Sequence, residues 1–319
     1  MKKVTYVLAL LLVIGTASAQ TDVYFKINHF LGSNPFAFNT SASNNMGNTF
    51  NVKRLQYYIA EIKIVHDGGQ ITDVPNKWIL VNANSTVNEM LGNFNITSIE
   101  AVKFGIGVQL SHNHLDPSTY PSTHPLAPKS PSMHWGWSAG YRFLAFEGKQ
   151  GPSLNQTFEF HSLGDGNYHT FTIATAGKMV GNDLEIELNA DYEKALYNID
   201  LSTGNNIVHG ETGKAADILV NFSYEVFTSS EGNGSIGLDE DDPNPFRMYP
   251  NPSNGIFTIE GVEAGQRIVV YNAIGTVVLD RVYNENDQDE INLDNAGVYV
   301  VQVLENENVV ETERIVIVK

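Results

Sequence analysis

The sequence contains no cysteine. This absence excludes disulfide bonds, thiol nucleophiles and thiolate metal ligands, so a site for a soft metal ion would need histidine, methionine or a less usual donor. Basic residues are also scarce, with 19 Lys and Arg against 36 Asp and Glu. Nucleic acid is therefore not an expected partner, because phosphate binding requires clustered positive charge.

Long helical patterns and membrane-length apolar runs are missing as well. The apolar stretch near the N-terminus, Val7–Ile14, is too short for a membrane span. It follows Lys2 and Lys3 and precedes the small-residue motif Ala17-Ser18-Ala19, so residues 1–19 are predicted to be a cleaved secretory signal peptide. We expect no transmembrane anchor in the mature chain.

Familiar catalytic motifs are not found either. The sequence has no Gly-x-Ser-x-Gly elbow, no Walker loop and no His-Glu-x-x-His motif. The acidic residues Asp183, Glu185 and Glu187 alternate along a predicted strand, a pattern typical of a solvated face. The sequence therefore predicts a protein that is not an enzyme.

The residues that are abundant in the sequence indicate a folded β-protein. Hydrophobic residues make up 42% of the chain and charged residues 17%, which favours a globular structure over disorder. Short alternating segments separated by turn signals predict an all-β body with a β-sandwich architecture. The predicted body strands are Val23–Ile27, Asn51–Val65, Trp78–Val81, Ser98–Gln109, Tyr141–Glu147, Gln156–His161, Tyr168–Ala174, Asp183–Asn189 and Asp217–Phe227, with one short helix at Asp191–Tyr197.

A second unit follows the body. Residues 229–245 combine Gly, Ser, an acidic run and prolines, so we predict a linker between a body at 20–228 and a small C-terminal β-sandwich at 246–319. The segment from Asp239 to Lys319 holds 16 acidic and 5 basic residues, which places most of the negative charge in the tail. The tail strands are predicted at Gly255–Glu260, Arg267–Tyr271, Thr276–Arg281, Val298–Leu304 and Val309–Val318.

The tail carries several ordered motifs. They are Met248–Gly255, Val270–Gly275, Ala296–Tyr299 and the closing Arg314–Lys319. With these motifs the tail resembles the C-terminal sorting domain of the type IX secretion system. The resemblance implies passage through the periplasm and across the outer membrane, then release or surface attachment, with the secretion machinery as a partner.

The segment Ser111–Gly148 has the highest density of candidate functional residues. It contains four of the nine histidines and two of the three tryptophans, and its first part is a proline-rich loop with Pro117, Pro121, Pro125, Pro128 and Pro131. Ordered loops of this length tend to be functional. If His112 and His114 lay on a strand they would share one face and could chelate one ion. The predicted metal ligands are His112, His114, His124, His134 and His161. Imidazole suits copper, zinc, iron and nickel alike.

The body also resembles a known family. Met133–Trp137, Gly140–Phe143 and Glu147-Gly148 match the central motif of the MbnP-like copper-binding family of exported β-proteins. That resemblance implies copper bound by two histidines and, in some members, by an oxidised tryptophan (kynurenine). Trp135 and His161 carry over by motif. His134 stands where an aromatic residue is common, and the family does not cover the loop that holds His112, His114 and His124.

Together these observations predict a secreted or cell-surface metal-binding protein that captures or hands over its ion. Copper is the expected ion, with zinc or no metal as alternatives, and Trp135 and Trp137 are expected beside it as cofactor-binding aromatics. The alternative is a surface module that binds glycans or a partner protein through the same two tryptophans. The oxidation state, delivery partner and oligomeric state stay open at this point.

Overall fold

The computed structural model describes residues 20–231, 247–249, 253–272, 275–284, 290–305 and 308–318. The predicted signal peptide at 1–19 and most of the predicted linker lie outside these residues. The chain divides into two compact units, at 1–237 and 238–319. Each unit has its own hydrophobic core.

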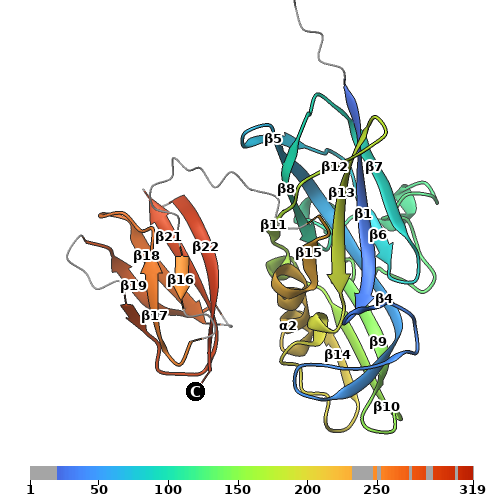
Figure 1. The fold of residues 1–319 in the computed structure, drawn as a ribbon. Coiled ribbons are helices and arrows are strands. Elements are labelled where there is room, and N and C mark those ends of the chain that lie inside the picture. The colour runs from blue at the N-terminus through green and yellow to red at the C-terminus, as the bar shows by residue number, and fades with distance from the viewer. Residues whose placement is uncertain are drawn as a thin grey trace, which may run out of the picture. The chain divides into compact units, whose positions relative to one another are not determined.

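The first unit is a β-sandwich of two curled sheets, as the alternating sequence pattern predicts (Figure 1). In the part of the chain that the structure describes, one sheet has six strands: β1 (Thr21–Leu31), β2 (Asn34–Pro35), β7 (Val87–Phe94), β12 (Lys178–Val180), β13 (Asp183–Asp191) and β15 (Phe227–Ser229). The other has nine: β3 (Ser41–Ser43), β4 (Thr49–His66), β5 (Gln70–Asp73), β6 (Ile79–Asn82), β8 (Ile99–Ile106), β9 (Leu144–Gln150), β10 (Gln156–Ser162), β11 (Thr170–Ala174) and β14 (Asn206–Gly210).

The long strand β4 organises the nine-stranded sheet, because β3, β5, β6, β8 and β9 all pair with it. Its register with β8 shifts between Ala60 and Lys63, where Glu61 has a φ of 52°. Such a bulge adds one residue and changes which side chains face the core. The buried alternating positions are accordingly Leu55, Tyr57 and Ile59 before it and Ile62 and Ile64 after it.

One predicted strand is wrong. Asp217–Phe227 folds mainly as the helix α2 (Lys214–Asn221), which continues into the π-helix η4 (Phe222–Val226). Ile218, Phe222 and Val226 recur every four residues and are all buried, which is a helical period rather than a strand period. The remaining short helices are α1 (Leu110–Asn113), η1 (Pro117–Thr119), η2 (Asp165–Asn167) and η3 (Lys194–Leu196).

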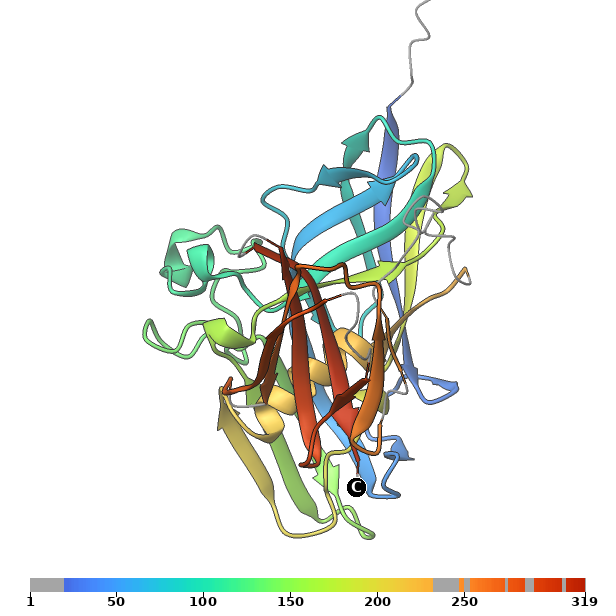
Figure 2. The same cartoon turned by 90° about the vertical axis from the view of Figure 1, so that its left-hand side faces the viewer.

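The proline-rich loop lies on the outer side of the nine-stranded sheet and projects from the body (Figure 2). Two buried tyrosines fasten it: Tyr58 Oη donates to the carbonyl of Pro125 at 3.3 Å, and Tyr141 Oη donates to that of Leu126 at 2.6 Å. Their rings pack edge to face. The loop therefore has fixed anchors on β4 and just before β9.

The hairpin turn at His66–Gly69 joins β4 to β5 and is held by several hydrogen bonds to Asp67. Asp67 accepts hydrogen bonds from the backbone and hydroxyl groups of Thr97 and Ser98 and from His66 Nδ1. Burial acts to raise the pKa of Asp67, but these hydrogen bonds outweigh it and hold that pKa well below its usual range.

We expect Asp67→Asn to lower the free energy of unfolding by about 1–2 kcal/mol at neutral pH, because hydrogen bonds to a charged acceptor are lost. A carboxylate with a depressed pKa stabilises the fold above its unfolded pKa, and the effect fades as pH falls through the folded pKa. The difference between variant and wild type should therefore shrink toward low pH. Urea unfolding at several pH values measures it, and a difference that grows on acidification would contradict it.

The tail is a smaller sandwich. Its described strands form one sheet of three, with β16 (Arg247–Tyr249), β17 (Ile256–Glu260) and β20 (Glu290–Asn292), and one of four, with β18 (Arg267–Asn272), β19 (Val277–Val282), β21 (Gly297–Glu305) and β22 (Asn308–Ile317). Its core includes Phe257, Ile268 and Val301.

Candidate metal centre

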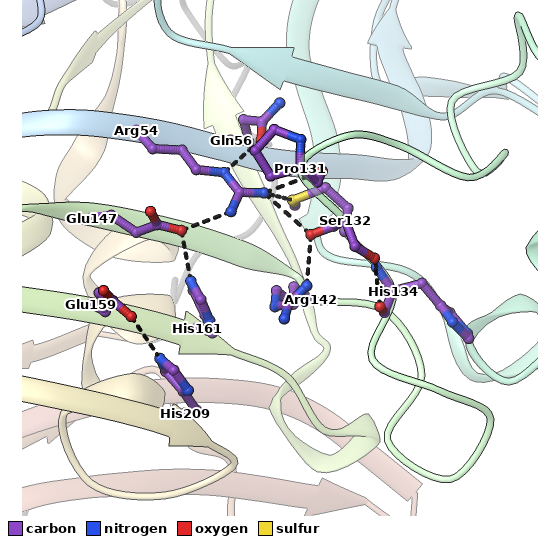
Figure 3. A network of polar contacts seen from close by, with 11 residues as sticks. Arg54, Gln56, Pro131, Ser132, His134, Arg142, Glu147, Glu159, His161 and His209 are labelled. Carbon is purple, nitrogen blue, oxygen red and sulfur yellow. Dashed lines mark hydrogen bonds and ion pairs between the residues drawn. The ribbon is translucent and has the colours of Figure 1, made fainter.

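Three neighbouring strands of the nine-stranded sheet bring polar side chains to one outer patch. β9 pairs antiparallel with β10 and sets Glu147 opposite Glu159. β10 pairs parallel with β14 and sets His161 opposite His209. Because residues two apart on a strand share a face, Glu159 and His161 point to the same side of the sheet. Figure 3 shows the resulting row of two carboxylates and two imidazoles.

His161 is buried, and its two ring nitrogens have different surroundings. Nε2 donates to Glu147 Oε1 at 2.8 Å, and the same oxygen accepts from Arg54 Nη1 at 2.7 Å. The hydrogen bond from His161 and the charge of Arg54 lower the pKa of Glu147. The other nitrogen, Nδ1, is buried and finds no hydrogen-bond partner among the described residues. In the neutral ring this atom carries a lone pair, which is what a metal ion requires.

His209 repeats the arrangement. Its Nε2 lies 3.4 Å from Glu159 Oε2, and its ring stacks on that of His161 with centroids 4.2 Å apart at an angle of 15°. Burial, followed by the adjacent His161, lowers the pKa of His209, so its neutral form persists to lower pH than that of a free histidine. A ring nitrogen held by a carboxylate while the other stays open is the usual state of a metal-ligating histidine.

Trp135 stands beside both imidazoles. Its ring is 5.8 Å from that of His161 and 5.0 Å from that of His209, edge to face in both cases. The guanidinium of Arg142 lies 4.5 Å from the Trp135 centroid, a cation–π distance. Trp135 is 39% exposed, whereas Trp137 is 69% exposed and its ring is not part of this packing. Of the two predicted aromatics, only Trp135 is packed against the histidine pair.

The structure does not bring His134 or His124 to this patch. His134 packs against Tyr141, and Figure 3 shows it directed away from His161. Its Nδ1 accepts from the amide of Gly136 at 3.2 Å, while Nδ1 of His124 accepts from that of Leu126 at 3.1 Å. A neutral ring that accepts at Nδ1 carries its proton on Nε2. Nε2 of His134 is buried and, like Nδ1 of His161, finds no hydrogen-bond partner among the described residues.

His112 and His114 lie elsewhere too. They do not share a strand face, because α1 ends between them. His112 packs against Trp78, which also contacts His124. His114 donates from Nδ1 to the carbonyl of Trp137 and from Nε2 to Asp165, each at 2.8 Å, so both of its nitrogens are engaged.

Sequence reasoning missed His209. It follows Ile207-Val208 and precedes Gly210, outside the histidine-rich segment Ser111–Gly148. The available signal was an alternating strand ending in histidine just before a glycine, the same form as Phe158–His161 with Gly164 after it. The sequence alone does not show that these two strands, whose histidines are 48 residues apart, pair in parallel.

Comparison with known families shows which family the body belongs to. The MbnP family model matches residues 20–210, more than half of the chain. The chain belongs to the MbnP family. A second model, the secretion system C-terminal sorting domain, matches residues 247–318. A search of curated proteins finds no match.

Two solved structures are similar to this MbnP-family chain. MbnP from Methylosinus trichosporium is 13% identical with a TM-score of 0.41, over 60% of this chain and 81% of that one. PorZ, a surface component of the type IX secretion system of Porphyromonas gingivalis, is 11% identical with a TM-score of 0.21, over 89% of this chain and 45% of that one. Both TM-scores are too low to support a residue-by-residue comparison.

The sorting domain confirms the predicted destination. A type IX tail directs this MbnP-family protein to the cell surface or the medium, and the secretion machinery is its partner during export. None of the helices among the described residues is long and apolar enough to cross a membrane.

Proposed function

We propose that this secreted MbnP-family protein binds a copper ion at the His161–His209 pair, for capture or handover rather than for turnover of a substrate. The observation that carries the proposal is the buried Nδ1 of His161, which has no partner among the described residues, beside a second imidazole whose Nε2 also faces a carboxylate. The predicted signal peptide at 1–19 would bring the chain to the periplasm, and the sorting domain would direct it from there to the cell surface or the medium.

The donor set fits copper chemically. Neutral imidazoles are borderline ligands that suit this ion, and the chain offers no thiolate to compete with them. Glu147 and Glu159 hold the Nε2 side of each ring, which leaves the Nδ1 atoms for the metal. Trp135 limits access of water. An unmodified indole has no lone pair to donate, so Trp135 would become a ligand only if oxidised, as the family resemblance implies.

The arrangement also limits how the ion binds. The described residues contain no group of three or more His, Cys, Asp or Glu side chains that could hold a metal. In addition, the in-plane lone pairs of two nearly parallel rings do not converge on one point. We therefore expect the stacked imidazoles to turn relative to each other on binding, which would change the environment of the adjoining Trp135.

Copper analysis of the purified secreted protein tests the proposal. We expect one copper per chain in the wild type and a loss of at least about tenfold in affinity in His161→Gln and in His209→Gln, because each variant removes one of two ligands. Copper should also alter Trp135 fluorescence in the wild type. His134→Gln is the matched control and should keep its copper, because His134 packs against Tyr141 and is directed away from the pair.

A copper-free wild type, or equal copper in all four proteins, would contradict the proposal. The exposed indole of Trp137 favours a second candidate, a module that binds glycans or a protein. That function would appear as polysaccharide or partner binding that is lost in Trp137→Ala and unchanged in His161→Gln.

A further inference from the structure

Trp135 is carried by a tight turn that closes at Gly140. The amide of Trp135 donates to the carbonyl of Gly140, and the amide of Gly140 donates to that of Gly136, both at 2.8 Å. At the tip of this turn the carbonyl of Trp137 accepts from His114 Nδ1. The turn that places Trp135 is therefore held from outside by a residue of the proline-rich loop.

His114 is held in a defined charge state by its partners. Nδ1 faces a backbone carbonyl and Nε2 faces the carboxylate of Asp165, and neither of these groups has a hydrogen to give. Both ring nitrogens must therefore carry a proton, which makes His114 an imidazolium. Consistent with this geometry, the hydrogen bond to Asp165, followed by that to the Trp137 carbonyl, raises the pKa of His114.

Asn113 completes the connection. It is fully buried, its Nδ2 donates to Asp165 Oδ1 at 2.8 Å, and its Oδ1 accepts from the amide of Tyr141 at 2.8 Å. Gly140 has a φ of 72°, and a Cβ at this position would lie 2.5 Å from Asn113 Oδ1. The end of the turn thus packs directly against Asn113, and only glycine fits there.

Asp165 links the turn to the strands that carry the histidine pair. It follows His161 by four residues and opens η2. Within η2, Asn167 Nδ2 donates to the carbonyls of Leu163 at 2.7 Å and Glu211 at 3.0 Å. Glu211 comes two residues after His209. Residues just beyond both histidines and the tip of the tryptophan turn therefore meet at one place.

We propose that Asn113, His114 and Asp165 form a latch that positions Trp135 over the His161–His209 pair. The three are positioning residues, because their hydrogen bonds reach the turn and not the two imidazoles. The effect of the latch on copper rests on the proposed function, whereas its effect on the turn does not. Breaking it should loosen the turn and weaken metal binding although both ligands are intact.

The test uses the full secreted protein with His114→Ala and Asp165→Asn, and Asp116→Asn as a matched control. Asp116 lies in the same loop, but its side chain accepts only within its own turn, from the amide of Ser118. Amide hydrogen exchange of residues 134–141 should be at least about tenfold faster in both latch variants and unchanged in the control. Copper affinity should fall roughly tenfold, the usual cost of losing an outer partner of a metal site.

A second measurement follows His114 itself. Asp165 and Glu211 place negative charge near the His114 ring, and His134 also lies nearby. NMR titration should therefore find the pKa of His114 above that of a free histidine, and the Asp165→Asn substitution should lower that pKa. Because the folded pKa is raised, the latch is fully formed below the unfolded pKa and weakens as pH rises through the folded one. A structural contact with no charge would leave the pKa unchanged and would overturn the imidazolium assignment.

The possible outcomes separate the two proposals. Unchanged exchange of the turn in both latch variants would overturn the latch, whatever the copper result. Faster exchange with wild-type copper affinity would overturn its positioning role. Faster exchange in a protein whose wild type binds no copper would support the latch and overturn the copper function.

Discussion

Removal of residues 247–319 is expected to leave the protein in the periplasm, with essentially none at the cell surface or in the medium. The sorting-domain model matches residues 247–318, and type IX export acts on that signal. The body has its own core and contains both histidines of the pair, so it should fold without the tail. Fractionation of cells that produce the full chain and the truncated chain measures the change.

The truncated protein provides its own control. Its unfolding transition and its copper content should match those of the body in the full-length protein, because the two cores share no residues. Equal secretion of the full and truncated chains would show that the tail is not required for export. A truncated body that aggregates would instead contradict the independence of the two units.

Phe104→Ala is expected to destabilise the body strongly. Phe104 is fully buried on β8, and its ring packs against those of Phe25, Phe171 and Phe227 at centroid distances of 5.7, 4.7 and 5.4 Å. Phe25 and Phe227 belong to the opposite sheet, so this ring bridges the two layers. Truncation leaves a cavity between them, at a cost of about 3–5 kcal/mol.

Chemical denaturation of the body would measure this loss, and a parallel fall in melting temperature of roughly 6–20 °C is expected for a domain of this size. Ile71→Ala is the control, because Ile71 is 65% exposed and should change stability by no more than about 0.5 kcal/mol. A similar change in the two variants would mean that the aromatic cluster is not the centre of the core.

The sheet architecture could be predicted because its signals are local. Alternation along Asn51–Val65 and the glycines at 68 and 69 encode a long strand and its hairpin within twenty residues. The segment 217–227 was mispredicted because β-branched and aromatic residues favour strand in isolation. In the fold, its buried positions recur every four residues. Tertiary burial outweighed local propensity there.

The candidate site could be predicted only in part. His161 and Trp135 lie in recognisable motifs, and the structure places their rings side by side. The partner of His161 depends on strand pairing between distant segments, which sequence spacing does not encode. The histidines of the proline-rich loop were predicted as ligands because they lie close together in the sequence. Which ring nitrogen of each is free depends instead on neighbouring amides, carbonyls and carboxylates. Whether a histidine can ligate therefore depended on contacts visible only in three dimensions.

The parallel pairing of β10 with β14 joins two strands that are far apart in the chain. Between these strands the chain adds β11 to the other end of the nine-stranded sheet, adds β12 and β13 to the opposite layer, and then returns. His161 and His209 are therefore neighbours only through the pairing of two strands that are separated by strands of both layers. A chain in which β14 slipped or failed to pair with β10 would present one imidazole at the proposed site instead of two, so binding there requires the whole body to be correctly paired.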